Sequence, residues 1–388
     1  MRLPTGPGLA IGISEQNPAL FWSAKAKPDL GAFGPWRDRL VALRAALYRL
    51  SVDWAAIQPT QHDAPDFGQR NDGCMRGIKP CRSYDGIREI LQAIHSEQQD
   101  GGGFEVLVAI YGVPDWAAAP ATGCQLPGIG SLSRPITAAG LNGYRALIRS
   151  LLALGRQEGV ALRWWTPWNE PNGYLFISPQ RKACSPHSPA RSPAIYTRLA
   201  RAMRAELASA PNSPRLVIGE LADITRPSKH GVSVPEFWRA LPDDVVCSAA
   251  VYSQHEYARS GGRPEGKGAV GQLKDLLGAR PCARGKPIWV TESGVGGTHA
   301  GSKRAATPAA QREDCRSLDA LWAKWRDDPR VQAAFQYTFR DDPTYPVGLA
   351  DAALTHSWPT YDLVRAWGGS RNSTDPAPPL PAGCSKEG

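Results

Sequence analysis

Eight short apolar segments, rich in β-branched and aromatic residues, recur along the chain, and each is followed by a loop and a longer segment with helical periodicity. The predicted strands are residues 9–14, 47–52, 104–111, 163–168, 215–219, 249–253, 287–291 and 333–339. The predicted helices are residues 36–47, 85–99, 138–157, 190–210, 234–241, 267–277, 308–326 and 359–367. Because sequential parallel strands need helical crossovers and eight strands close a sheet, this alternation predicts an α/β fold, a single (β/α)8 TIM barrel.

The main alternative is an open, doubly wound sheet. Such a sheet normally carries a glycine-rich phosphate turn after its first strand, and residues 13–18, Ile-Ser-Glu-Gln-Asn-Pro, do not form one. No linker divides the chain, so we expect a barrel over residues 1–369 and a proline-rich tail over 370–388. Long segments at 55–83, 112–137 and 171–193 follow strands, which places them on the catalytic face of a barrel.

Composition limits the function classes. The 388 residues are 42% hydrophobic, and 45 Lys+Arg against 36 Asp+Glu give a diffuse net charge of +9. No basic cluster points to nucleic acid, and no apolar run approaches the roughly 18 residues of a membrane helix. We therefore expect a monomer that neither inserts into membranes nor binds nucleic acid. Because Met1-Arg2-Leu3-Pro4 does not begin a signal peptide, any secretion signal is expected outside this chain.

The eight cysteines show no metal-binding spacing, which favours disulfides and a secreted or envelope-associated protein. Eight cysteines allow 105 pairings. Two of these are suggested by position: Cys74 with Cys81 inside one loop, and Cys124 with Cys184 between the loops after the third and fourth strands. Cys384 is a candidate to tie the tail to the barrel.

The strongest chemical signal is residues 164–172, Trp-Trp-Thr-Pro-Trp-Asn-Glu-Pro-Asn, where the fourth predicted strand ends in an amide and a carboxylate. Side chains at the carboxyl end of a barrel strand point into the active-site mouth. Glu170 would therefore stand in a pocket walled by indoles, including that of Trp168. Such a pocket favours the uncharged form of a carboxyl group, as a general acid requires.

A second carboxylate ends the seventh predicted strand, in residues 286–294, Lys-Pro-Ile-Trp-Val-Thr-Glu-Ser-Gly. Glycosidic cleavage uses two such carboxyl groups, one that protonates the leaving oxygen and one that attacks the anomeric carbon or activates water. Glu170 and Glu292 are therefore the predicted catalytic pair, with no cofactor and no metal ion. The sequence that starts at His255-Glu256 lacks the second histidine of a zinc-protease helix.

Trp168-Asn169-Glu170-Pro171 and Val290-Thr291-Glu292-Ser293-Gly294 resemble the signatures of glycoside hydrolase clan A, the 4/7 superfamily. The resemblance spans residues 11–339 and is nearest to families 39 and 5. It implies that Glu170 is the acid/base, that Glu292 is the nucleophile, and that Asn169 donates to the sugar 2-hydroxyl. Retention then requires the two carboxyl groups to lie about 5–5.5 Å apart.

Other positions match the clan pattern less specifically. Arg49 resembles the arginine beneath the nucleophile, whose charge would keep Glu292 ionised, although an ordinary barrel salt bridge is the alternative. His255-Glu256-Tyr257 resembles an element whose tyrosine contacts the nucleophile and whose imidazole lines the sugar site. Strand alternation aims His255 and Tyr257 the same way and Glu256 elsewhere.

Aromatic residues supply the remaining predicted sugar contacts. Trp54 and Trp116 are candidates to stack on a pyranose, although several of the 13 tryptophans must belong to the core. The eighth strand carries Tyr337 near the position where much of the clan has a tryptophan, so this part of the −1 subsite departs from the pattern.

The sequence therefore predicts a retaining glycoside hydrolase that acts on an oligo- or polysaccharide by double displacement. A catalytically silent glycan-binding barrel is the alternative, since a fold does not determine its function. A barrel of another reaction class, a lyase or an aldolase, also stays open. The sugar, its linkage and its anomeric configuration depend on loops whose conformations the sequence does not determine.

Overall fold

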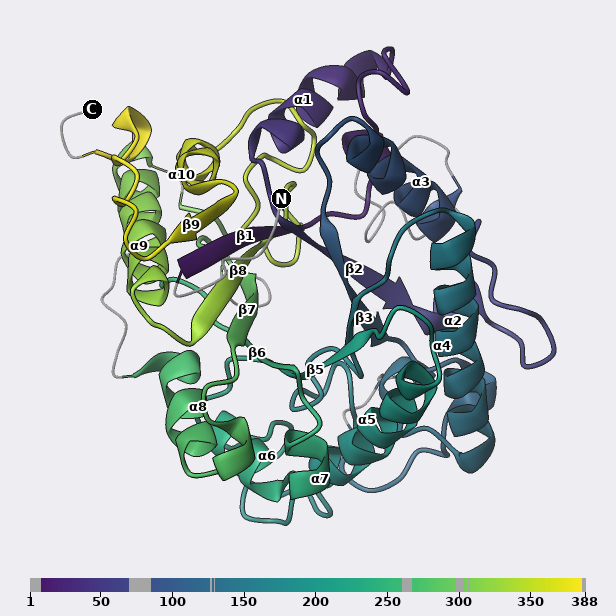
Figure 1. Cartoon of the computed structure of the whole chain (residues 1–388). Coiled ribbons are helices and arrows are strands. Elements are labelled where there is room, and N and C mark those ends of the chain that lie inside the picture. Colours follow the sequence, from purple (N-terminus) through teal and green to yellow (C-terminus); the bar gives the residue numbers. More distant parts are fainter. Residues whose placement is uncertain are drawn as a thin grey trace.

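Eight parallel strands close into a barrel, with helices packed around it (Figure 1). The structure is a computed structural model that describes residues 8–69, 85–125, 128, 130–259, 267–297, 303–305 and 307–385. Hydrogen bonds join the strands in sequence order, and β1 pairs with both β2 and β8, which closes the sheet. The strands are β1 Gly8–Ser14, β2 Leu47–Asp53, β3 Glu105–Tyr111, β4 Trp164–Thr166, β5 Arg215–Leu221, β6 Val251–His255, β7 Ile288–Ser293 and β8 Val331–Tyr337. The predicted (β/α)8 barrel is confirmed.

Helices connect successive strands and cover the outside of the barrel (Figure 1). They are α1 Gly34–Ala42, α2 Trp54–Ile57, α3 Gly86–Gln99, α4 Ala138–Gln157, α5 Ser192–Ala208, α6 Val234–Ala240, α7 Asp243–Val246, α8 Gly268–Gly278, α9 Pro308–Arg326 and α10 Pro359–Trp367. The bounds of α4, α9 and α10 are those expected from the sequence. The one-turn helices α2 and α7 are not predicted by periodicity, because four residues are too few to show it.

The barrel interior is apolar at one end and polar at the other. Buried side chains of the strands fill the first end, among them Leu47, Trp164, Val251 and Trp289. Inward-facing side chains recur every two residues along a strand, so the residues two and four positions after Leu47 and Val251 also face inward. In β2 and β6 those later positions are polar, and the polar end of the barrel is where the candidate site lies.

Three disulfides connect the described part of the chain. The predicted Cys124–Cys184 bond is present, and the others are Cys247–Cys282 and Cys315–Cys384. The predicted Cys74–Cys81 bond lies outside the described residues. Cys315 belongs to α9, so its bond attaches the tail to the barrel wall.

The tail contains a short ninth strand. Residues Ser370–Asn372 form β9, which pairs antiparallel with the start of β1. The sequence does not predict this strand, since three polar residues carry no alternating pattern. Among the described residues, no helix combines the length and apolar character needed to cross a membrane.

Candidate active site

The two predicted catalytic carboxylates face each other at the carboxyl ends of β4 and β7. Glu170 follows β4 with a backbone φ of 38°, and Glu292 belongs to β7. One carboxylate oxygen of Glu170 lies within 4.8 Å of one of Glu292. The Glu292 side chain is 9% exposed, whereas the Glu170 side chain is 22% exposed. Glu170 is therefore the carboxyl group more open to the solvent.

Glu292 is turned into the barrel by an irregularity in β7. Opposite β6, the pairing passes from Gln254 with Val290 to His255 with Glu292, so β7 has one extra residue here. Such a bulge re-aims the side chain that follows it, and bulges are common beside active sites. The outward-to-inward alternation of β7 thus changes phase just before the carboxylate.

The Glu292 carboxylate contacts Arg49, Tyr257 and His255. The Arg49 Nη1 atom lies 3.0 Å from Oε1, and the Tyr257 hydroxyl donates to Oε2 at 2.6 Å. Burial raises the pKa of Glu292 above its ordinary value, while His255 and Arg49 oppose that rise and Glu170 adds to it. Both predicted contacts, from Arg49 and Tyr257, are thus present, but the arginine charge does not fully offset the burial of Glu292.

Arg49 also fixes the orientation of Asn169. The guanidinium Nη2 donates to Asn169 Oδ1 at 2.5 Å. Because the amide oxygen is held in this way, the NH2 end is the one available to donate to a ligand. This orientation fits the predicted hydrogen bond from Asn169 to a sugar hydroxyl, which stays a prediction.

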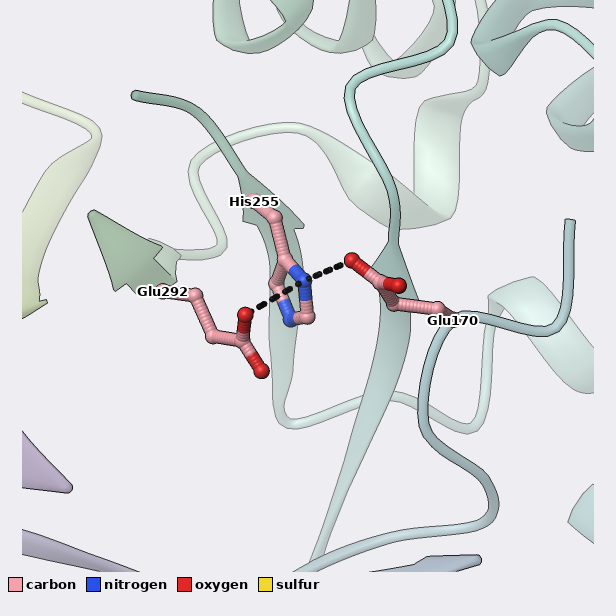
Figure 2. Close-up of side chains that lie close together, drawn as sticks. All are labelled: Glu170, His255 and Glu292. Atoms are coloured by element: carbon pink, nitrogen blue, oxygen red, sulfur yellow. Dashed lines mark hydrogen bonds and ion pairs between the residues drawn. The ribbon is translucent and has the colours of Figure 1, made fainter. Parts of the chain in front are cut away.

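His255 lies between the two catalytic candidates and not on the sugar-facing surface. Figure 2 shows the imidazole between Glu170 and Glu292, with Nδ1 2.9 Å from Glu170 Oε1 and 3.4 Å from Glu292 Oε2. The residue is 0% exposed, and its place in the sugar site stays a prediction. Burial alone would lower the pKa of His255, but Glu292, Glu170 and a third carboxylate raise it to about 10.

The third carboxylate, Glu220 at the end of β5, is a residue that the sequence analysis missed. Its Oε2 atom accepts from Arg49 Nε at 3.0 Å and Nη2 at 2.7 Å, and it lies 3.3 Å from His255 Nε2. Burial disfavours the charged form, yet Arg49 and His255 together lower the pKa of Glu220 to about 2. Glu220 is therefore a fully buried anion held by two cations.

A bulge explains why alternation fails to predict Glu220. Val217 belongs to the inward apolar layer, so a regular β5 would aim Glu220 outward. One extra residue in β5 between Ile218 and Leu221 changes the phase, and Glu220 has a φ of 57°. The preceding Gly219 has a φ of 136°, and a Cβ there would lie 2.0 Å from the Ser253 carbonyl oxygen. The Gly-Glu pair at a strand end is the only sequence signal for this arrangement.

Two of the tryptophans predicted to contact a sugar are packed inside the protein. Trp54 is 0% exposed, donates to Gln58 Oε1 at 2.8 Å and packs in the core. Trp168 is 1% exposed and donates to the Phe176 carbonyl at 2.9 Å. Neither ring offers a face to a sugar. The indole wall expected around Glu170 is thus packed inside the protein.

Other aromatic residues stay open to a ligand. Trp116 is half-buried, with its N–H donating to the Gln58 carbonyl at 3.0 Å. Tyr337 is also half-buried, and Tyr345 lies edge-on to both Tyr337 and Tyr257. The pKa of Tyr345 is raised by burial and by the charges of Glu170 and Glu292, and the ring of this unpredicted tyrosine contacts Tyr257, which donates to Glu292. Trp116, Tyr337 and Tyr345 are the aromatic candidates for sugar contact.

Glu170, His255 and Glu292 are also spaced closely enough to ligate a metal ion. Within the described ranges, this is the one group of histidine, cysteine and acidic residues with that spacing. However, Arg49 lies against Glu292, and the pKa of His255 favours an imidazolium at neutral pH. Two cations at this point would repel a metal ion, so the charges fit a catalytic pair better than a metal centre.

No family model matches the chain, and no curated protein sequence matches it. Solved structures do match. A family 39 glycoside hydrolase from Bacteroides cellulosilyticus WH2 aligns with a TM-score of 0.54 at 16% identity, over 94% of this chain and 64% of its own length. A family 5 glycoside hydrolase from Bifidobacterium longum, solved with Manβ1-4GlcNAc, aligns at 0.51 and 14% identity over 92% and 77%. A family 30 endoxylanase from Clostridium papyrosolvens C71 aligns at 0.52 and 12% identity over 94% and 72%.

These three structures come from clan A, the group that the sequence motifs resemble. At these identities the likeness establishes the fold. This chain spans less than two thirds of the family 39 protein.

Proposed function

We propose that the chain is a retaining glycoside hydrolase that cleaves O-glycosidic bonds of an oligo- or polysaccharide. The observation that carries this proposal is the carboxylate pair, with one oxygen of Glu170 within 4.8 Å of one of Glu292. Retaining enzymes separate the two carboxyl groups by about 5–5.5 Å, and inverting enzymes by about 6.5–9.5 Å to admit a water molecule. The observed spacing supports direct attack on the sugar.

The two carboxyl groups differ in a way that suits two roles. Glu292 is buried, accepts from Tyr257 and lies against Arg49, so these contacts hold the nucleophile in place and oppose the effect of burial on its charge. Glu170 is more exposed and can exchange protons with a leaving group or with water. The resemblance to clan A assigns the same roles.

The reaction then has two steps. A Glu292 oxygen attacks the anomeric carbon while Glu170 transfers its proton to the departing glycosidic oxygen, which gives a glycosyl ester on Glu292. Glu170, now a carboxylate, takes a proton from water as the water oxygen attacks the same carbon and releases Glu292. Two displacements retain the anomeric configuration. Asn169 donates from its amide to the sugar, and Trp116 and Tyr337 contact the ring.

We further propose a β-linked substrate and an oxidising compartment. The family 5 neighbour holds a β-1,4-linked disaccharide, and the family 30 neighbour is an endoxylanase. Three disulfides support a secreted or envelope-associated location. The mechanism requires neither a cofactor nor nucleic acid, and we propose that the protein acts as a monomer.

The test is hydrolysis of a panel of plant, fungal and bacterial cell-wall glycans and aryl glycosides, with released sugars measured by mass spectrometry. Wild type should release a product that Glu170→Gln and Glu292→Gly do not. Azide should restore turnover of an activated aryl glycoside by Glu292→Gly, because the small anion occupies the space of the carboxylate. Glu206→Gln, which changes an ion-paired glutamate on α5, is the control and should behave as wild type.

Two results would contradict the proposal. Full activity of Glu292→Gly without azide would remove Glu292 as the nucleophile. Calorimetric binding of a glycan by wild type with no product formed would favour a silent glycan-binding barrel.

A further inference from the structure

Glu220 is a buried charged residue of the site that the proposed reaction does not use directly. It lies at the end of β5, is 0% exposed, and contacts both Arg49 and His255. A fully buried carboxylate in an enzyme site is costly to keep unless it is paired and hydrogen-bonded. Its position behind the histidine that faces the catalytic pair suggests a role in that site.

We propose that Glu220 is a positioning residue that holds His255 as a doubly protonated imidazolium against the catalytic carboxyl groups. This inference rests on the proposed function, because it gives that imidazolium a role in the two displacement steps.

The geometry supports the charged form of the ring. Nε2 faces Glu220 at 3.3 Å, and Nδ1 faces Glu170 at 2.9 Å, so both nitrogens point at carboxyl oxygens. A neutral imidazole donates from only one nitrogen, whereas the imidazolium donates from both. Glu220 cannot turn away, because Arg49 donates to the same Oε2 atom from Nε and Nη2. These contacts fix the Glu220 carboxylate in position against the His255 ring.

The charges around His255 also balance in the form that starts the reaction. Arg49 faces the site from β2, Glu220 from β5 and Glu292 from β7, while Glu170 follows β4. With Glu170 protonated as the general acid, two cations oppose the two anions Glu220 and Glu292. The more exposed Asp223 adds a longer-range negative charge from the loop after β5. Without Glu220, the same cluster would carry an unbalanced positive charge, and His255 would lose its proton more readily.

The imidazolium faces the ionised carboxylate in each half of the reaction. Before attack the anion is Glu292, 3.4 Å from Nδ1. In the glycosyl ester that charge is gone, and the new anion is Glu170, 2.9 Å from the same nitrogen. One fixed N–H therefore stabilises the charge at both stages without moving, which is the kind of preorganisation that lowers barriers.

The experiment compares wild type with Glu220→Gln by two measurements. The first follows the ring nitrogens of ¹⁵N-labelled histidine by NMR from pH 5 to pH 9, and it needs no substrate. We expect His255 to stay doubly protonated throughout this range in wild type and to lose a proton within it in the variant. The second is the pH profile of kcat on the best aryl glycoside, where the variant should lose at least ten-fold at pH 8 with a small change in KM.

Glu256→Gln is the matched control. Glu256 is also buried, directly follows β6, and its carboxylate accepts from the Val270 amide on α8. This variant should leave the His255 titration unchanged.

A neutral His255 in wild type at pH 7 would overturn the inference, whether or not Glu220→Gln folds. An unchanged His255 titration in a folded Glu220→Gln protein would also overturn it. Because the NMR result does not depend on turnover, it separates a failure of this inference from a failure of the proposed function.

Discussion

Replacement of Arg49 by Met should destabilise the protein strongly, although the barrel core is untouched. Arg49 is 2% exposed and is the shared partner of Glu220, Asn169 and Glu292. Methionine fills most of the space of the arginine stem but donates no hydrogen bond. The variant would therefore leave two buried carboxylates without their guanidinium.

The expected loss is about 3–5 kcal/mol in the free energy of unfolding, as found when one partner of a buried ion pair is removed. Unfolding entropy is about 2.1 cal/mol/K per residue, so for 388 residues a loss of about 4 kcal/mol lowers the midpoint by roughly 5 °C. The deficit should shrink at acid pH. Glu220 loses the cation that lowers its pKa to about 2, so in the variant it is protonated at a higher pH than in wild type.

The assay is thermal and urea unfolding of both proteins between pH 3 and pH 8. Arg201→Met is the matched control, because Arg201 pairs with Asp244 at 2.8 Å on the surface, where its side chain is 51% exposed. This control should leave the midpoint essentially unchanged, since exposed ion pairs add little. A loss below about 1 kcal/mol for Arg49→Met at pH 7 would refute the argument that the buried charges depend on this arginine.

Three further predictions concern Tyr257, the Cys124–Cys184 bond and the charge of His255. Tyr257→Phe removes the 2.6 Å hydrogen bond to Glu292 and should lower kcat/KM by roughly ten-fold to a hundred-fold, because a hydrogen bond to a charged group contributes about 1.5–3 kcal/mol. Steady-state kinetics on an aryl glycoside test this prediction, and an unchanged kcat/KM would exclude a role for the hydroxyl. Replacement of both Cys124 and Cys184 by serine opens a loop with a sequence separation of 60 and should cost roughly 4 kcal/mol in urea unfolding, whereas an unchanged urea midpoint would contradict the entropic argument. The free energy of unfolding should fall as the pH rises from about 6.5 to about 10. His255 has a pKa of about 10 when folded and an ordinary pKa of about 6.5 when unfolded, so its stabilising contribution is complete below about pH 6.5 and is lost as the pH rises to about 10. A free energy of unfolding that stays constant over this range in calorimetry would contradict the raised pKa.

The sequence predicts the barrel and the positions of its main carboxylates because both depend on local patterns. Strand and helix periodicities survive in the closed barrel, and the carboxyl end of a barrel strand has a fixed location relative to the mouth. Glu170 and Glu292 therefore come together as expected, although 122 residues of chain separate them by their numbering. The Cys124–Cys184 bond follows from the same adjacency of loops.

The sequence does not predict the inward position of Glu220 or the burial of Trp54 and Trp168. The first depends on a bulge that shifts the inward–outward alternation of a strand, and the second depends on side-chain packing. The bulge in β5 turns Glu220 inward against simple alternation, so no periodicity reveals it. Trp54 and Trp168 look like sugar-binding residues in the sequence, because an indole suits both a core and a sugar face. Only the packed structure shows that both rings are fully occupied by protein neighbours.

The most direct test of the retaining mechanism is to trap the glycosyl ester on Glu292. Wild type is incubated with 2-deoxy-2-fluoro analogues of whichever glycoside it hydrolyses, and the labelled peptide is then sequenced by mass spectrometry. We expect one added sugar per chain, bound to Glu292, and no stable label in Glu292→Gly. A label on another residue, or hydrolysis of the parent glycoside with inverted anomeric configuration, would contradict it.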